Sequence, residues 1–216
     1  MGNKSLKCII ALLIQLSAKS LLADSPLTST YIANFYYDHA IVSTAESTHG
    51  LNQEIMAFLA DEHTLIDVKA AVINAIGWSY AGNANASQFW QYLADKHGST
   101  AEKLNLKDLN AHELFSYGYL MALGDYFNVE AAITVLELAA QKQTASFTIH
   151  LFLAVTKAQK AMNNDWCQVW QLTSAVLNDT SLKRDLKTAA IQSVVDYMIL
   201  YKSSCAEADR ASGGRR

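Results

Sequence analysis

Two short stretches combine carboxylates with a histidine, the residue types that acid–base catalysis or metal binding requires. They are Asp61-Glu62-His63 in "ADEH" and His112-Glu113 in "NAHE". Both fall at expected helix ends, where solvated charges and capping explain the same residues. The six histidines show no metal-ligand spacing, and G-x-S-x-G, H-E-x-x-H, C-x-x-C and a glycine-rich phosphate loop are all absent from the sequence. We therefore expect no catalysis, no metal and no cofactor.

An alternative interpretation keeps these acids as catalytic groups. Asp61, Glu62 or Glu113 would supply carboxylates to an all-α hydrolase that acts on cell-envelope material. This requires side chains from separate helices to converge in a cleft with shifted pKa values, which the sequence alone does not show.

The first residues have the layout of a secretory signal peptide. Lys4 and Lys7 precede the apolar run "CIIALLIQLSA" (8–18), and small residues follow it. The run is shorter than the roughly 20 residues that span a bilayer, so a cleaved signal is favoured over an uncleaved anchor or a buried helix. We expect cleavage after Ala23, with Ser20 as a competing site, and a protein that is periplasmic or secreted.

Removal of the signal makes the chain more acidic. The loss of residues 1–23 lowers Lys+Arg from 17 to 14 against 20 Asp+Glu, so the net charge changes from −3 to −6. An acidic chain without a basic stripe is a poor partner for nucleic acid. No second apolar segment of spanning length follows, so we expect no stable membrane insertion after cleavage.

Two cysteines remain after cleavage, Cys167 and Cys205. In an oxidising compartment such a pair favours one disulfide, which would tie the last helix to the helix beginning near Asp165. The alternative is two buried thiols.

The elements that must position these residues are helices. The chain is 51% hydrophobic with one proline and nine glycines, too few breakers for the many tight turns of a β fold. Apolar residues recur at spacings of three and four throughout. The pattern predicts about nine helices, with starts at Ser25-Pro26, Thr64, Ser87, Asn110, Asn128, Ser146 and Asp165 and a last helix over 183–203.

The helices come in pairs with related sequences. "LFSYGYLM" (114–121) and "INAIGWSY" (73–80) share one pattern. Each begins with a large apolar residue, continues with an apolar or aromatic residue directly before a glycine, and then has another large residue. "LGDY" (123–126) followed by "EAAITVLELA" (130–139) is similar to a repeat's turn and second helix. Over about 65–180 the chain resembles the tetratricopeptide-repeat superfamily. The resemblance implies a right-handed stack of antiparallel helix pairs, an α-α superhelix.

The same resemblance implies a concave groove formed by the first helices of the pairs. The positions that match its surface are aromatic or polar, and they are Asn74, Trp78, His112, Phe115 and Tyr119. Aromatic rings supply buried area and Asn or His supplies hydrogen bonds, so this groove would capture a peptide. The alternative is that these residues pack against the N-terminal helices.

The repeated glycines predict close packing. Gly77 and Gly118 match each other and are expected where paired helices approach too closely for a side chain, whereas Gly124 belongs to the turn that follows. The tryptophans Trp90, Trp166 and Trp170 fall on expected core faces.

The sequence as a whole predicts three parts: a signal peptide over 1–23, one helical-repeat domain over 24–205 and a disordered tail over 206–216. We expect an exported interaction module that binds a protein or peptide without catalysis. The alternatives are the envelope hydrolase and a structural subunit of an envelope assembly.

Overall fold

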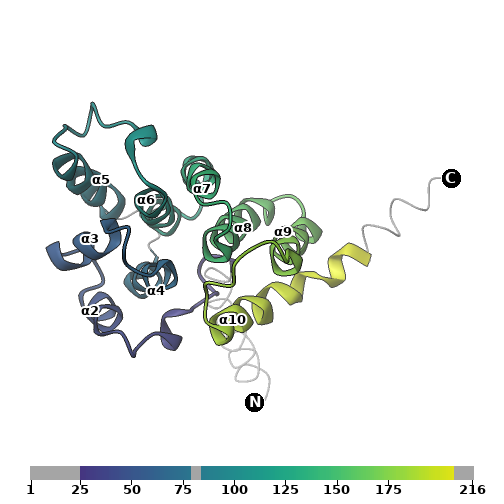
Figure 1. Ribbon diagram of the computed structural model, residues 1–216. Helices are drawn as coiled ribbons and strands as arrows, with labels where there is room; N and C mark the ends of the chain where they lie inside the picture. Colours follow the sequence, from purple (N-terminus) through teal and green to yellow (C-terminus); the bar gives the residue numbers. More distant parts are fainter. Residues whose placement is uncertain (1–24, 79–83, 207–216) are drawn as a thin grey trace, which may run out of the picture.

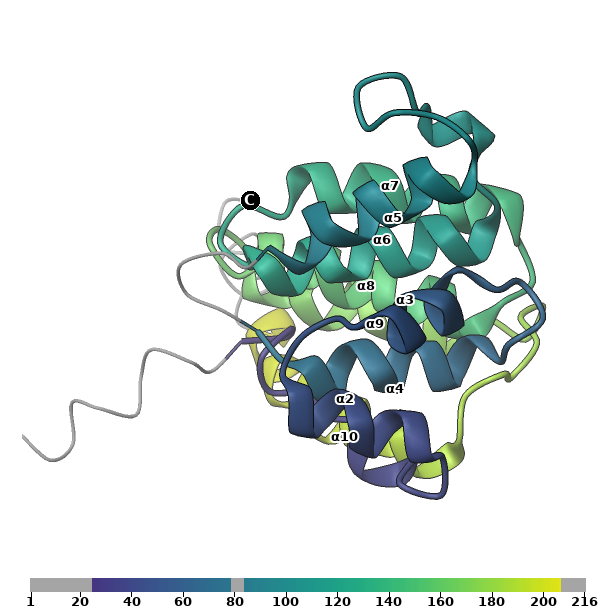
Figure 2. The same ribbon diagram turned by 90° about the vertical axis from the view of Figure 1, so that its left-hand side faces the viewer.

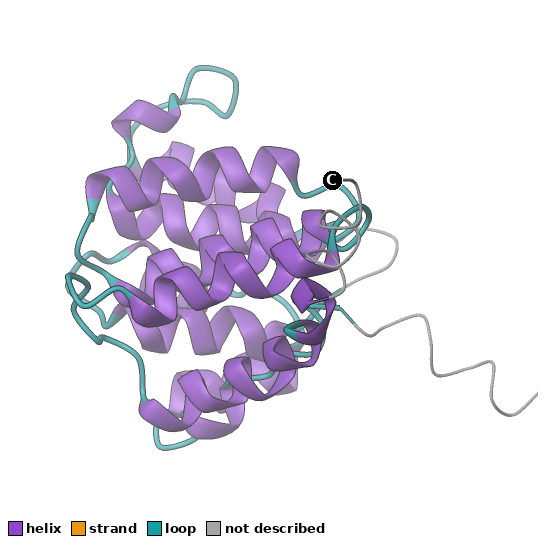
Figure 3. Ribbon diagram, turned by 90° about the vertical axis from the view of Figure 1, so that its right-hand side faces the viewer, coloured by secondary structure: helices purple, strands orange, loops and turns teal. Residues whose placement is uncertain are grey.

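The computed structural model describes residues 25–78 and 84–206. In these residues every regular element is a helix and no strand is present (Figure 3). The expected all-α fold with about nine helices is confirmed for the described chain. The α-helices are α2 Ala40–Thr48, α3 Gln53–Ala60, α4 Ile66–Ile76, α5 Asn85–Lys96, α6 Ala111–Gly124, α7 Glu130–Lys142, α8 Phe147–Ala161, α9 Trp166–Asn178 and α10 Thr188–Met198; the 3₁₀ helices are η2 Ala33–Phe35, η3 Leu106–Asp108 and η4 Ile199–Tyr201.

Helices α5 to α9 form a row across the molecule, and α2, α4 and α10 lie on one side of it (Figure 1). Figure 2 shows the same arrangement from the side, with α5, α6 and α7 above and α2, α4 and α10 below. Consecutive helices α6 and α7, and α8 and α9, pack extensively and are joined by short turns, so each pair is antiparallel. Helix α4 packs chiefly on α2 and α6, while α5 packs on α6. The pair expected to begin near Thr64 is therefore divided between other neighbours.

Three helix starts follow the expected capping chemistry. Asn110 accepts a hydrogen bond from the Glu113 amide, and the Glu113 carboxylate accepts one from the Asn110 amide, which completes a capping box at the start of α6. Ser146 caps α8 and Asp165 caps α9 through their side-chain oxygens. These local signals are sufficient because each cap is made within one turn of the chain.

The two matched glycines have different roles. A Cβ atom on Gly118 would lie 2.9 Å from Cγ of Leu136, so α6 and α7 approach too closely for a side chain, as expected. Gly77 has φ of 86° and nothing within 4 Å of its Cβ position. The expectation of close packing at Gly77 is therefore wrong. This glycine ends α4 by adopting a backbone conformation that L side chains rarely adopt.

The N-terminal segment, residues 25–37, differs from the continuous helix expected there. It makes one turn after Ser25 and the short helix η2, and a longer helix begins only at Ala40. Its side chains Leu27, Ile32 and Tyr36 are almost completely buried. Tertiary contacts, described below, hold its backbone out of the helical path.

Other boundaries shift by a few residues where a side chain bonds elsewhere. The Ser87 hydroxyl donates to the carbonyl of Ala84, and α5 begins before it at Asn85. Thr64 donates to Phe58 and Asp61 instead of capping α4. Helix α7 begins at Glu130, after Asn128 has bonded to Asp125. The last helix is shorter than expected because residues 182–187 are not helical; there Lys183 exchanges backbone hydrogen bonds with the chain around Ser146.

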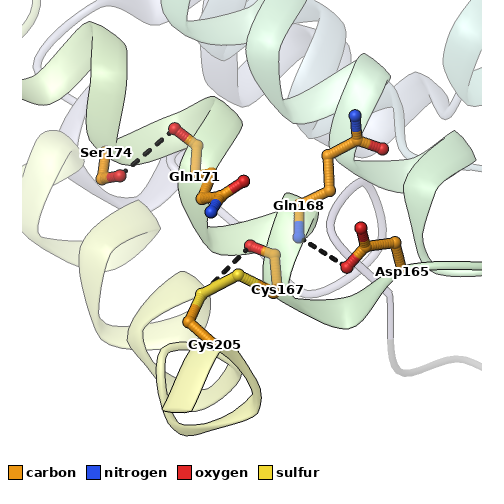
Figure 4. Close-up of a disulfide and its surroundings, with 6 residues drawn as sticks. All are labelled: Asp165, Cys167, Gln168, Gln171, Ser174 and Cys205. Atoms are coloured by element: carbon orange, nitrogen blue, oxygen red, sulfur yellow. Dashed lines mark hydrogen bonds between the residues drawn. A yellow bond between two sulfur atoms is a disulfide. The ribbon is translucent and has the colours of Figure 1, made fainter. Parts of the chain in front are cut away.

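Cys167 and Cys205 form the expected disulfide. Figure 4 shows it joining the first turn of α9 to the chain that follows η4. The loop that it closes has a sequence separation of 38 residues. In the chain-entropy model a loop of this size contributes about 4 kcal/mol to stability.

Within the described residues, no helix has the length and apolar character needed to cross a membrane. The expected signal peptide over 1–23 lies outside the described residues, as does the expected tail beyond Ala206.

Candidate functional site

Asn74, the first of the expected groove residues, is buried and forms hydrogen bonds with the backbone of the N-terminal segment. Its Oδ1 accepts hydrogen bonds from the amides of Ile32 at 2.7 Å and Ala33 at 3.2 Å. Its Nδ2 donates to the carbonyl of Thr30 at 3.2 Å. The side chain therefore does recognise peptide backbone, but that backbone belongs to the same chain.

Tyr119 and Phe115 lie beside this contact and are completely buried. Asn74 Nδ2 also donates to the Tyr119 hydroxyl at 3.2 Å. Both rings pack against Phe152 of α8, with centroid distances of 4.7 Å for Tyr119 and 6.2 Å for Phe115. Asn74, Phe115 and Tyr119 thus present no open surface to a partner. The expected groove is corrected at these positions, because the N-terminal segment lies over this side of α4.

Trp78 and His112 are partly exposed, and they lie apart. Trp78 packs edge-on against Tyr126 at 5.4 Å, at the end of α6, whereas His112 is in the first turn of that helix. The Nδ1 atom of His112 is buried without a hydrogen-bond partner among the described residues, and burial lowers the pKa of this ring. The structure therefore brings three of the five expected groove residues together and leaves these two at opposite ends of α6.

A second polar region lies where α3, α5 and α6 meet. We call Lys69, Lys96, His97 and Glu113 the helix-end cluster. The buried Glu113 carboxylate accepts from Lys96 Nζ at 2.6 Å and lies 3.0 Å from His97 Nε2. Its other oxygen accepts from the Asn110 amide at 2.9 Å. Burial alone would raise the pKa of Glu113, but the contacts with Lys96, Asn110 and His97 outweigh it and hold the pKa below its ordinary value.

The cluster lies beside the exposed turn 61–65, so the structure brings "ADEH" and "NAHE" together. Three open clefts of about 580, 330 and 300 Å³ surround this turn. The largest runs from Leu65 and His112 to the segment 183–187 that precedes α10. The sequence places the two motifs on helix ends, but only the packing of α3 against α6 makes those ends adjacent.

Two of the acids around these clefts, Asp61 and Glu113, are held in their charged forms. The Asp61 carboxylate accepts from the His63 amide at 2.9 Å, and this contact lowers its pKa. Both oxygens of Glu113 are already bonded. A general acid needs a raised pKa, so these contacts favour structural roles for Asp61 and Glu113. Among the described residues, no group of three or more His, Cys, Asp or Glu side chains could hold a metal ion.

A third region, missed by the sequence analysis, is an exposed apolar surface near the disulfide. We call Trp166, Ile199 and Leu200 the C-terminal apolar patch; their exposed fractions are 58%, 47% and 65%. The placement of Trp166 in the core is therefore wrong, whereas Trp90 and Trp170 do pack against the core. A signal was available for two of these residues, because Ile199 and Leu200 fall off the apolar face of the last helix.

The patch is held in place by its surroundings. The Trp166 indole donates to the carbonyl of Met162 at 3.0 Å, and its ring meets Tyr201 edge-on at 6.1 Å. Tyr201 in turn shares a hydrogen bond of 2.7 Å with Tyr197. Cys167, the residue after Trp166, forms the disulfide with Cys205 (Figure 4). No family model, no curated protein and no solved structure matches the chain.

Proposed function

We propose that this protein is an exported, non-catalytic interaction module, built as a tetratricopeptide-like stack of helix pairs, that binds a protein or peptide through the C-terminal apolar patch. The observation that carries the proposal is the exposure of Trp166, Ile199 and Leu200 on a surface pinned by a disulfide. Single exposed apolar side chains are normal on a protein surface, but three of them on two elements in contact, α9 and η4, favour an interaction site.

The patch has the properties of a binding anchor. Tryptophan is among the residues that contribute most to interfaces, and complete burial of one large apolar side chain contributes about 1.5–3 kcal/mol. Trp166 is hydrogen-bonded to Met162 and meets Tyr201 edge-on, so little rotamer freedom is lost on binding.

Export is supported by two features. A disulfide between Cys167 and Cys205 persists in an oxidising compartment, and the first residues resemble a secretory signal peptide. The partner would accordingly be another extracytoplasmic protein.

Site-specific photo-crosslinking in the producing cell tests the proposal. A photo-reactive residue at Leu200 should give a discrete adduct, and Trp166→Ser in the same chain should abolish it without changing the melting temperature. Phe127 is the matched control, because it is 59% exposed but lies in the turn between α6 and α7. Equal adducts at Leu200 and Phe127, or none at Leu200, would overturn the proposal. An adduct of twice the chain mass would instead support a structural subunit that binds its own copy.

The hydrolase alternative has one observation in its favour, the meeting of Glu62 and His63 with Asn110 and Glu113 around the clefts. It predicts that purified protein degrades envelope material and that Glu62→Gln removes this activity.

A further inference from the structure

Two lysines reach the same helix end in different ways. The carbonyls at the end of α3 have no partner within the helix and need donors from elsewhere. Lys96 Nζ donates to Ala60 at 2.9 Å and also pairs with the Glu113 carboxylate. Lys69 Nζ donates to Leu59 at 2.8 Å and to Asp61 at 2.6 Å. In the described chain no carboxylate lies within ion-pair distance of Lys69.

The surroundings of Lys69 suit a neutral amine. The side chain is completely buried on α4, and the two carbonyls match the two N–H groups of an uncharged amine. An ammonium group would carry a third N–H and a charge in a site with no counterion in contact, which is costly.

Charged groups face Lys69 from each side of the site. Asp61 faces it from the turn after α3, Lys96 from α5, and His112 and Glu113 from α6. Burial, followed by the charge of Lys96, lowers the pKa of Lys69 from 10.5 to about 7, against the opposing effects of Asp61 and Glu113.

We propose that Lys69 is a pH-sensitive latch that holds the turn 61–65 against α4 while its amine is neutral and loosens that turn when the amine is protonated. Because this turn borders all three clefts, the latch couples external pH to the shape of that end of the molecule. The inference is independent of the partner proposed for the C-terminal apolar patch, which lies on α9 and η4.

The sign of the effect on stability follows from proton linkage. Between about pH 7 and 10.5 the unfolded chain binds a proton at Lys69 that the folded chain does not bind. Stability therefore rises with pH across this window, and the cost of charging the buried amine is fully present below it. The folding equilibrium constant should rise by up to roughly a thousandfold through this group.

The full-length chain and two variants test the latch by urea unfolding between pH 6.5 and 9.5. Lys69→Met should fold, since Leu59 still accepts from the Ser116 hydroxyl and Asp61 from Thr64. The matched control is Lys142→Met. Lys142 Nζ also donates to two carbonyls, those of Lys107 and Leu109, but this lysine is exposed.

We expect the folding constant of the unmodified chain and of Lys142→Met to rise at least tenfold more over this range than that of Lys69→Met. The same pH slope in Lys69→Met and the unmodified chain would overturn the latch.

Two further measurements need no variant. The NMR titration of the Lys69 Cε signal should show a midpoint near 7, and amide exchange in the turn 61–65, corrected for intrinsic rates, should accelerate as pH falls towards that midpoint and level off below it. A titration midpoint at the ordinary lysine value, or amide exchange in the turn 61–65 that does not change with pH, would refute the proposal.

Discussion

Two buried polar regions hold this molecule together, and they differ in charge. We call Asn74 and Tyr119 the strap anchor; it is neutral and fixes the N-terminal segment to α4 and α6. The helix-end cluster consists of titratable groups and fixes α3 to α4, α5 and α6. Both satisfy backbone groups that would otherwise be buried without partners. A neutral amide makes its contacts at any pH, whereas the contacts of titratable groups depend on their protonation.

The largest expected effect is at Asn74. Asn74→Ala leaves the amides of Ile32 and Ala33 and the carbonyl of Thr30 without partners, so the free energy of unfolding should fall by about 4 kcal/mol. Chemical unfolding between pH 5 and 8 should give the same loss throughout, because Asn74 does not titrate. Asn52 is the control: it caps α3 locally through the Ile55 amide, and Asn52→Ala should cost only about 1 kcal/mol. Equal losses in the two variants would contradict the anchor.

An intermediate effect is expected at Glu113. Glu113→Gln keeps the capping box but removes the charge that faces Lys96, so unfolding at pH 7 should require about 2 kcal/mol less free energy. The folded pKa of Glu113 is below its ordinary 4.5, so its charge stabilises the fold above that pH and the gain is lost as pH falls through the folded value. The variant should therefore lose less stability than the unmodified chain between pH 5 and 3.

The surface pair Glu137–Lys157 supplies the control for this prediction. Its atoms are 2.7 Å apart, but both side chains reach solvent, so Glu137→Gln should change stability by less than about 1 kcal/mol. If Glu113→Gln and Glu137→Gln lower the free energy of unfolding equally at every pH, the charge of Glu113 does not stabilise the helix-end cluster.

The smallest effect is expected at Tyr119. Tyr119→Phe removes one hydrogen bond to Asn74 and keeps the ring against Phe152, so thermal unfolding should show a loss of about 1 kcal/mol. If Tyr119→Phe lost as much stability as Asn74→Ala, the Tyr119 hydroxyl and not the Asn74 amide would be the main stabilising group.

Features that depend on neighbouring residues in the chain were predictable. The caps at Asn110, Ser146 and Asp165 are local, and so is the amphipathic spacing that predicted the helices. The cysteine pairing was predictable for a different reason, because only one pair of cysteines lies beyond the expected signal peptide.

Features that depend on distant segments were not predictable. Gly77 and Gly118 occupy matching sequence positions, yet only Gly118 faces a neighbouring helix closely, because α4 has different neighbours from α6. The groove residues also matched a repeat pattern, but a pattern cannot show that the N-terminal segment returns to bond with Asn74. Trp166 looked like a core residue because its type and spacing do not reveal what packs beside it.

The sequence alone was enough to predict the helical class, the caps at Asn110, Ser146 and Asp165, the disulfide partners and the groups able to carry charge. Tertiary structure alone decided which of these groups lose contact with water. It buried Lys69 without a contacting carboxylate, turned Asn74 toward the chain's own backbone and left Trp166 exposed. The physical reason is that hydrogen bonding within a turn is local, whereas burial is set by segments far apart in the chain.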